Sequence, residues 1–440
     1  MQKNRDLLQR SLASVWHPCT QMKHHERYPL VPIVRGAGVW LYDADGKRYL
    51  DAVSSWWVNL FGHSNLRIKD AIKAQLDQLE HVMLAGFTHE PVVKLSEKLG
   101  ELTGLGHAFY GSDGASATEI ALKMSFHFWR NTGKPNKTKF ISLQNSYHGE
   151  TLGALGVTDV AIFKDTYAPL LSQSAQMPSP DFRLAEAGES AEDFALRCAD
   201  ALETYIAAHH ESVAALIIEP LVQCAAGMGM YHPIYLKRAR EICSQYQVHL
   251  IADEIAVGFG RTGTMFACEQ AGGKVSDIAD FVCLSKGITG GYLPLSAVLT
   301  TDEIYQAFYD DQTVKGFLHS HSYTGNPLAC SAALATLNIF EIEDVLGNNQ
   351  LLAQAMLKAV QSYDLSLLNI RQRSMVTAFE VNTHNQYFAR HCYAAALKHG
   401  LLLRPIGNTV YWMPPYCITT EEIAHMAQAT QLAIQESLAA

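Results

Sequence analysis

The chain has 440 residues, of which 48% are apolar and 18% charged. This is an ordinary globular composition, so disordered, collagen-like and mucin-like classes are excluded. The formal charge is −9, from 34 basic and 43 acidic residues, without a basic stripe. We therefore expect no nucleic-acid partner, and no apolar stretch reaches the roughly 20 residues that span a bilayer.

The nine cysteines are dispersed along the chain and form no C-x-x-C pair. Most have apolar neighbours, which predicts buried thiols in a reducing cytoplasm. The first ten residues are polar and lack the apolar core of a secretion signal, so we expect a cytoplasmic protein with no membrane segment.

Residues 11–60 are rich in aromatics, Pro and Gly and look irregular, and we expect residues 1–60 to pack with the smaller domain. Between 61 and 327, short apolar runs alternate with amphipathic stretches, which predicts a large α/β domain with a mostly parallel seven-stranded sheet between helices. Its clearest predicted strands are 140–143, 214–218, 249–253 and 280–284, and its clearest predicted helices are 192–210 and 232–247.

The pattern changes after Pro327, and residues 328–440 are expected to form a smaller α+β domain. Residues 328–362 look helical. Further helices are expected at 386–399 and 420–437, and strands at 375–381, 401–405 and 410–414.

An acid and a lysine end two consecutive predicted strands. Asp253 closes HLIAD, and Lys286 follows DFVCL in a segment with almost no other charge. Ligands of an open parallel sheet lie beyond the carboxyl ends of its strands, so both side chains should face one crevice. A desolvated lysine becomes a nucleophilic amine. The alternative is an incidental lysine in a Gly-rich loop.

The segment GSDGASATEIALKMSFHFWR (111–130) predicts an amphipathic helix with apolar positions at Ile120, Ala121, Met124 and Phe128. Ser116 and Glu119 have the spacing of a capping box. A glycine-rich turn that opens a helix offers backbone N–H groups to a phosphate. A well-capped structural helix is the plainer interpretation.

Two further motifs could bind a ligand. Tyr147 lies in QNSYHGET, directly after a predicted strand, where its ring could stack on a ligand or simply form a turn. GFGRTG (258–263) is a literal G-x-G-x-x-G, but it neither follows a strand immediately nor opens a strong helix, which disfavours dinucleotide binding. The histidine pairs lack companion ligands at metal spacing, so no metal site is expected.

Together these segments resemble the class III (ω-type) pyridoxal-phosphate aminotransferases, which have the fold-type I architecture. The resemblance runs from end to end and is carried by IADEIAVGFGRTG, DFVCLSKGITGGYLPLSAV and HSYTGNPLACSAAL. WHPCT, DAVSSWW, NSYHGET, RPIG and VYWMPPY are similar to the biotin-pathway branch. That branch moves an amino group from S-adenosylmethionine to 8-amino-7-oxononanoate, giving 7,8-diaminononanoate by a ping-pong reaction through pyridoxamine phosphate.

The resemblance implies a role for each residue around pyridoxal 5'-phosphate. Lys286 would hold the cofactor covalently and shuttle the proton. Asp253 would pair with the pyridinium nitrogen, and Tyr147 would stack on the ring. Gly114 and Ala115 would hold the phosphate, and Ser322 would reach it across the interface of a homodimer with shared active sites.

Substrate residues follow from the same resemblance. Trp56 and Trp57 would wall the pocket, with Tyr147, Gly291 and Tyr411 also facing substrate. Arg404 would bind the carboxylate of the long aliphatic ketone. Core packing for the tryptophans and an inter-domain salt bridge for Arg404 are the structural alternatives.

Three positions depart from the usual family pattern, namely Cys19 for Tyr, Ala115 for Ser and Ser322 for Thr. The cysteine at position 19 leaves open which amino donor the enzyme uses, because related enzymes use lysine. Two other hypotheses remain: a class III transaminase acting on another ω-amine, and a nucleotide-binding protein that uses GFGRTG.

Overall fold

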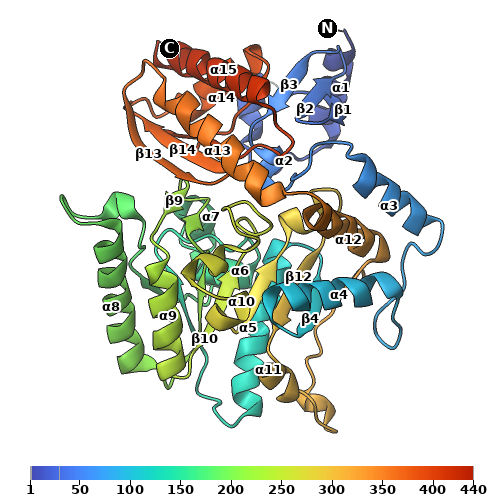
Figure 1. The fold of residues 1–440 in the computed structure, drawn as a ribbon, viewed down its shortest axis with the longest axis vertical. Helices are drawn as coiled ribbons and strands as arrows, with labels where there is room; N and C mark the ends of the chain where they lie inside the picture. The colour runs from blue at the N-terminus through green and yellow to red at the C-terminus, as the bar shows by residue number, and fades with distance from the viewer. Residues whose placement is uncertain (1, 29, 440) are drawn as a thin grey trace. The chain divides into compact units, whose positions relative to one another are not determined.

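The computed structural model describes residues 2–28 and 30–439 and divides into two units, drawn in Figure 1. Unit 1 combines Met1–Leu66 with Gly347–Ala440, and unit 2 is Arg67–Leu346. The sequence placed the boundaries after residues 60 and 327. The second boundary lies later in the structure because helix α12 (Pro327–Ile342) packs on α4 (Glu90–Thr103) and on the 3-10 helix Lys286–Thr289, which belong to unit 2.

Unit 2 is built on a seven-stranded sheet with the order β4-β12-β11-β10-β7-β5-β6. Strand β12 is antiparallel to both neighbours, and the pairs β11-β10, β10-β7, β7-β5 and β5-β6 are parallel. The mostly parallel sheet that the sequence predicted is therefore present. The strands are β4 (His107–Gly111), β5 (Lys139–Leu143), β6 (Ala175–Met177), β7 (Val213–Ile218), β10 (His249–Asp253), β11 (Phe281–Leu284) and β12 (Ser296–Thr300).

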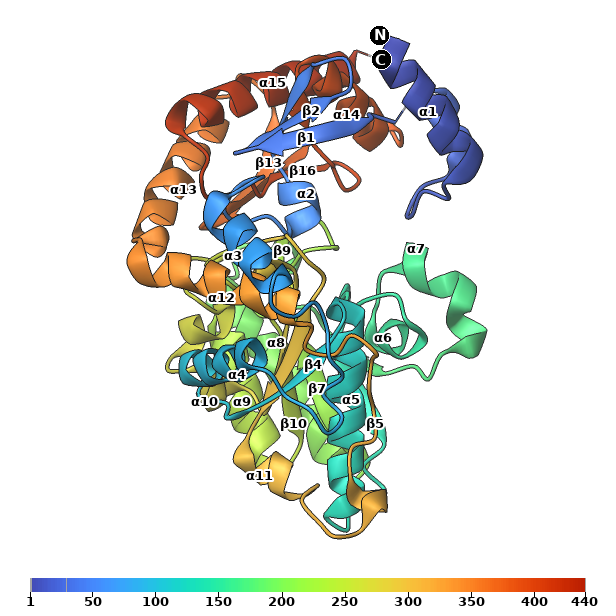
Figure 2. The same ribbon diagram turned by 90° about the vertical axis from the view of Figure 1, so that its right-hand side faces the viewer.

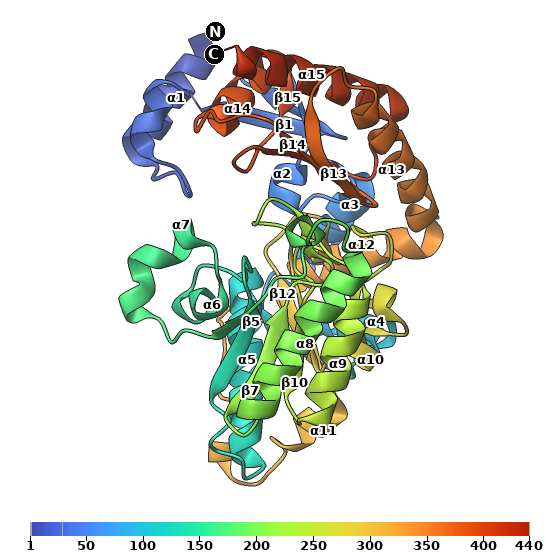
Figure 3. The ribbon, with the colours of Figure 1, turned by 90° about the vertical axis from the view of Figure 1, so that its left-hand side faces the viewer.

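Helices cover this sheet. Helix α5 (Gly114–Asn131) packs on β4, β7, β10, β11 and β12, and Figure 2 shows it running along the strands. Its apolar stripe at Ile120, Ala121, Met124 and Phe128 is buried in the core, as the sequence predicted. Helices α8 (Ala191–His209) and α9 (Ile234–Gln245) pack side by side and stand in front of β7 and β10 in Figure 3.

Unit 1 contains two sheets. One has the order β13-β14-β16, from β13 (Leu367–Arg373), β14 (Val376–Val381) and β16 (Thr409–Trp412). The other has the order β1-β2-β3-β15, from β1 (Ile33–Ala37), β2 (Trp40–Asp43), β3 (Arg48–Asp51) and β15 (Leu401–Leu402). Strand β15 pairs in parallel with β3, so the two ends of the chain share a sheet.

The expectation that residues 11–60 are irregular was therefore wrong over β1 to β3. These strands are short, and β1 and β2 are mostly exposed or half-buried, so they lack the clean apolar alternation that identifies a strand in a sequence. Helices α14 (Phe388–Lys398) and α15 (Thr420–Leu438) pack on each other within the same unit (Figure 1).

The remaining elements are short or peripheral. Among residues 2–28 and 30–439, no helix combines the length and apolar character that a membrane crossing needs. The other elements are α1 (Gln2–Ser14), α2 (Ser54–Trp57), α3 (Leu66–Leu76), α6 (Leu152–Val157), α7 (Ala161–Lys164), α10 (Val275–Ile278), α11 (Asp302–Gln306), α13 (Val345–Gln361), β8 (Val222–Gln223) and β9 (Gly229–Met230).

Candidate active site

The carboxyl ends of neighbouring parallel strands in unit 2 bring the predicted acid and lysine together. Asp253 is the last residue of β10 and pairs in register with Cys283 of β11. Lys286 follows β11 after one residue and begins the 3-10 helix Lys286–Thr289. The charge of Asp253 acts on the Lys286 ammonium. Both residues therefore belong to one site at one edge of the sheet.

The Asp253 carboxylate is buried and held by two donors. Its Oδ2 lies 2.7 Å from Nδ1 of His148, and its Oδ1 accepts a hydrogen bond from the Ile255 N–H at 3.1 Å. An ionised carboxylate only accepts, so Nδ1 of His148 carries the proton. Nε2 of His148 is buried and has no hydrogen-bond partner among the described residues.

Lys286 has an amine suited to nucleophilic work. Burial lowers its pKa below the usual value, while the negative charge of Asp253 opposes that shift. Its backbone is in the left-handed region with φ of 45°, which a non-glycine residue adopts only under local constraint. A lower pKa leaves more of the amine neutral near pH 7, and the neutral form is the nucleophile.

Glu219 is a site residue that sequence reasoning missed. It directly follows β7, and Ile218 before it pairs with Ala252 of β10. Its carboxylate accepts the N–H groups of Tyr147 at 2.9 Å and Cys224 at 3.2 Å. Burial, with a smaller contribution from the charge of Asp253, raises its pKa to about 7. Its position one residue past a fully apolar strand was a usable signal.

The predicted phosphate loop begins α5, but its cap differs from the expectation. Asp113 is the N-cap, and its Oδ1 accepts the N–H and the hydroxyl of Ser116. The capping box of Ser116 with Glu119 was wrong, because Glu119 instead accepts hydrogen bonds from the Thr151 hydroxyl and the Gly153 N–H. Gly114 and Ala115 occupy the first turn, where N–H groups point along the helix axis.

Tyr147 and Ser322 lie on loops of unit 2. The Tyr147 hydroxyl donates to Glu150 at 3.0 Å, and the ring meets Phe163 edge-on. Ser322 is on an exposed turn. His321 beside it approaches the Ser112 hydroxyl at 3.0 Å, which ties this turn to the loop before α5. Gly291 is exposed with φ of 87°, a conformation that favours glycine.

The predicted substrate residues of unit 1 form a second group. The Arg404 guanidinium lies over the Trp56 ring, 4.2 Å from its centroid. The Trp57 indole N–H donates to the Tyr411 hydroxyl at 3.1 Å. Trp57 and Tyr411 are buried, whereas 41% of Trp56 is exposed. Among the described residues of unit 1, no carboxylate forms an ion pair with Arg404, so a salt bridge within this unit does not account for it.

A left-handed turn carries both tryptophans. Ser54, Ser55, Trp56 and Trp57 have φ of 50°, 47°, 73° and 73°. Each such residue costs about 1–2 kcal/mol relative to a right-handed conformation. The buried Asp51 carboxylate accepts the Ser55 N–H at 2.9 Å and the Ser55 hydroxyl at 2.7 Å. No sequence pattern predicts this turn, because none of its residues is Gly or Asn.

Other motifs have structural roles. GFGRTG forms turns followed by the 3-10 helix Ala267–Ala271, so it opens no long helix of the dinucleotide-binding kind. Glu254 braces this region by accepting the Ala267 and Cys268 N–H groups. Within the described ranges, no group of three potential ligands could hold a metal ion.

The comparisons with known proteins agree with this geometry. The family model described as Aminotransferase class-III matches residues 21–434. The chain belongs to this family. It is an aminotransferase by that membership, and the dinucleotide-binding alternative is rejected.

Relatives and a solved structure indicate which members of the family this chain resembles. The adenosylmethionine-8-amino-7-oxononanoate aminotransferase of Helicobacter pylori is 48% identical over 94% of each chain, and that of Geobacter sulfurreducens is 41% identical over 96% of this chain and 95% of its own length. The crystal structure of the Methanocaldococcus jannaschii protein of that name has a TM-score of 0.91 and 37% identity, and it covers 98% of this chain and 99% of its own.

A second solved structure, an omega transaminase that does not carry that name, is also similar to this chain. The omega transaminase from Pseudomonas jessenii in complex with PMP has a TM-score of 0.92 and 28% identity, and each chain is covered to 98%. This class III aminotransferase therefore has the fold-type I architecture that the sequence predicted.

Proposed function

We propose that this class III aminotransferase moves an amino group from S-adenosylmethionine to 8-amino-7-oxononanoate with pyridoxal 5'-phosphate as cofactor. The donor's CH–NH₂ becomes a C=O and the acceptor's C=O becomes a CH–NH₂, so the exchange is balanced overall. The observation that carries the proposal is the Lys286 amine, whose pKa is lowered by burial, at the strand end beside Asp253. The near full-length relatives named for this reaction support the substrate pair.

The residues of unit 2 fit the cofactor's chemistry. When bound, pyridoxal phosphate supplies an electron-poor ring that takes up the electron pair left by a departing proton. Asp253 would keep the proton on the ring nitrogen, and His148 would hold Asp253 in place. Gly114 and Ala115 would direct N–H groups at the phosphate. Tyr147 would stack on the ring, and Lys286 would attach the cofactor and carry the proton.

The residues of unit 1 fit a long aliphatic acceptor with one carboxylate. Trp56 offers aromatic surface, with Trp57 and Tyr411 buried and hydrogen-bonded to each other, and Arg404 offers a planar cation that binds a carboxylate with two hydrogen bonds. Gly291 of unit 2 would allow close approach of backbone to substrate.

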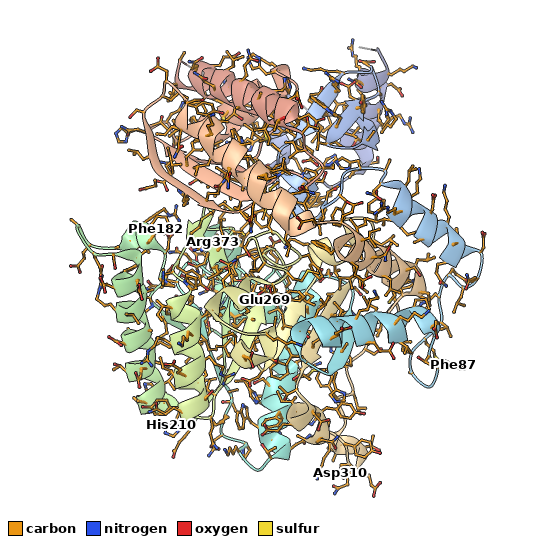
Figure 4. All side chains as sticks on the ribbon, viewed as in Figure 1. Phe87, Phe182, His210, Glu269, Asp310 and Arg373 are labelled. Atoms are coloured by element: carbon orange, nitrogen blue, oxygen red, sulfur yellow. The ribbon has the colours of Figure 1, made fainter. Side chains whose placement is uncertain are left out.

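We also propose a homodimer with shared sites, in which Ser322 serves the phosphate of the partner subunit. Large apolar side chains exposed on unit 2 support an interface. Phe87, 58% exposed, lies at the outer end of the loop before α4 in Figure 4. The exposed set includes Leu76, Met83, Phe87, Leu318 and Tyr323. Sedimentation analysis should give twice the chain mass, and a monomer would refute the shared site.

We expect the enzyme to work in the cytoplasm. Seven of its nine cysteines are buried as free thiols, a state that suits a reducing compartment. Fractionation of cells that carry the natural protein tests this expectation, and activity confined to an extracellular fraction would refute it.

The decisive assay compares amino donors. Purified holoenzyme is given 8-amino-7-oxononanoate with either S-adenosylmethionine or lysine, and 7,8-diaminononanoate is quantified by mass spectrometry. Product with S-adenosylmethionine supports the proposal. Product with lysine but not with S-adenosylmethionine would show that lysine is the donor. If neither donor gives product while another ω-amine is converted, the proposed acceptor is refuted.

Cys19 addresses the donor question separately. It is exposed in unit 1 at the position where the family usually has tyrosine. Cys19→Tyr should change kcat/KM for the donor while leaving kcat/KM for the acceptor unchanged. An unchanged donor value would mean that position 19 lies outside the donor site.

A further inference from the structure

We propose that Asp51 is a positioning residue that sets the substrate specificity of the tryptophan pair by holding residues 54–57 in their left-handed turn. This inference rests on the proposed function, because it deepens the role given there to Trp56 and Trp57. The hydrogen-bond partners of the Asp51 carboxylate among the described residues are Val53, Ser55 and His63, and neither indole is one of them. It acts through Ser55, which immediately precedes Trp56.

The Asp51 carboxylate is fully buried and accepts hydrogen bonds from several donors. Oδ1 accepts the N–H groups of Ser55 at 2.9 Å and Val53 at 3.3 Å. Oδ2 accepts the Ser55 hydroxyl at 2.7 Å and approaches Nε2 of His63 at 3.0 Å. Four donors from three residues converge on one side chain, which fixes the start of the turn.

The His63 ring extends this network in one definite direction. Asn59 accepts the Gly62 N–H through Oδ1 at 2.7 Å, so its amide nitrogen faces Nδ1 of His63 at 3.2 Å. Nδ1 is therefore the acceptor, and Nε2 carries the proton that is donated to Asp51. The backbone of His63 is itself fixed by two hydrogen bonds with Gly38. His63 and Ser55 therefore both hold Oδ2 of Asp51.

The far side of the turn is tied to strand β16 and the residue after it. The Ser54 hydroxyl donates to the Met413 carbonyl at 2.7 Å, and the Met413 N–H donates to the Ala52 carbonyl at 2.8 Å. Trp57 donates to Tyr411 in the same strand. These bonds fix where the turn lies, while Asp51 fixes its handedness at Ser55.

Handedness decides where the indoles point. Four successive residues with positive φ form a turn closed by the Trp57 N–H to the Val53 carbonyl at 2.8 Å and the Val58 N–H to the Ser54 carbonyl at 3.0 Å. L-residues relax from this conformation unless their surroundings prevent it. Loss of the Asp51 acceptors would let Ser55 relax. Trp56 would then leave the face of Arg404, and the apolar wall would lose its shape.

Asp43 provides a matched control. It is also a buried carboxylate that ends a strand, here β2, and accepts N–H groups of the following turn, from Asp45 and Lys47. It also accepts the Tyr49 hydroxyl. Its turn carries no proposed substrate residue. Asp43→Asn therefore reports the general cost of neutralising a buried acid in this unit.

The test measures holoenzyme variants by hydrogen exchange and by kinetics. In Asp51→Asn, amide exchange in the peptide covering residues 53–59 should accelerate by about tenfold or more, since the turn opens more readily. KM for 8-amino-7-oxononanoate should rise by about tenfold with kcat within about twofold, because ground-state binding is lost rather than chemistry. Asp43→Asn should change neither quantity.

Ser55→Ala keeps the test valid if Asp51→Asn does not fold. It removes one donor and should give smaller changes of the same kind. Unchanged exchange at 53–59 in either folded Asp51 or Ser55 variant overturns the positioning role. Faster exchange with an unchanged KM for the acceptor overturns the link to specificity.

The outcome is separable from the proposed function. A wild-type enzyme that fails to aminate the oxononanoate refutes the substrate but leaves the exchange measurement intact. In that case the KM comparison is made with the acceptor that the wild type does use, and an unchanged KM there overturns the inference.

Discussion

Nδ1 of His148 lies 2.7 Å from Oδ2 of Asp253, and both side chains are buried. The two residues come from different strand ends, after β5 and at the end of β10. The bond orients the carboxylate that we assign to the ring nitrogen of the cofactor, and a donor of this kind stabilises the charged carboxylate.

His148→Phe should therefore weaken cofactor binding. A hydrogen bond to a charged group contributes about 1.5–3 kcal/mol, which corresponds to a roughly 10- to 100-fold rise in the dissociation constant of pyridoxal phosphate. Fluorescence titration of the apoenzyme measures it. His249→Phe is the control, because His249 is a buried histidine at the opposite end of β10 whose partner is Ser125. Equal constants in the two variants would contradict the role of His148.

Lys286→Ala should abolish turnover while the protein still binds pyridoxal phosphate non-covalently. Borohydride reduction followed by mass spectrometry should detect covalent cofactor in the wild type and none in the variant. Lys137→Ala is the matched control, since burial also lowers the pKa of Lys137, to about 8, but its amine donates to backbone carbonyls. That control should lose stability and keep turnover. Substantial turnover by Lys286→Ala would end the proposal.

Glu219 should make stability depend on pH. Burial raises its pKa from 4.5 to about 7, so the folded protein binds more protons than the unfolded chain in that interval. Its contribution to stability is therefore complete below about pH 4.5 and falls as pH rises through 7. The free energy of unfolding of wild type relative to Glu219→Gln should decrease by about 3 kcal/mol from pH 5 to pH 8. Urea denaturation at both pH values measures this.

A variant at Glu254 distinguishes an effect on stability from an effect on the active site. Burial also raises its pKa to about 7, and it too accepts two backbone N–H groups. Glu254→Gln should show a similar dependence of stability on pH. Only Glu219→Gln should lower the pKa of Lys286 further, since the Glu219 charge acts on that amine. A shift of the pH–activity profile in both variants would contradict this assignment.

Arg404→Ala should raise KM for the oxononanoate by about tenfold or more, because charge-assisted hydrogen bonds to the carboxylate are lost. The effect on the donor should be smaller. Arg48→Ala is the control, as Arg48 lies 4.2 Å above the Trp40 ring in the same unit, with the same cation–π geometry. Equal loss for donor and acceptor in steady-state kinetics would refute the assigned role.

The main features of unit 2 could be predicted from the sequence. Strands such as β7 and β10 are buried on both faces, so they appear as short apolar runs, and Asp253 and Lys286 stand out against them. His148 and Glu219 were missed as partners of that pair, because the pairing order of the strands decides which loops meet. A sequence gives strands in chain order and not in sheet order.

Local details escaped prediction for other reasons. The Ser116 cap failed because the helix already begins at Gly114 with Asp113 as its N-cap, so Ser116 lies inside the first turn. The left-handed turn at residues 54–57 depends on Asp51, His63 and Met413 contacts that only the folded unit provides. Backbone strain that tertiary contacts impose cannot be recognised from the amino-acid composition.

The pairing of β3 with β15 has a consequence for biosynthesis. Asp51 meets Leu402 in register, yet Leu402 is synthesised only after the whole of the intervening chain. At about 5–20 residues per second the nascent N-terminal strands wait for tens of seconds without their partner. All of Arg67–Leu346 emerges during that delay, so the interior unit has time to fold before the sheet that joins the two chain ends can close.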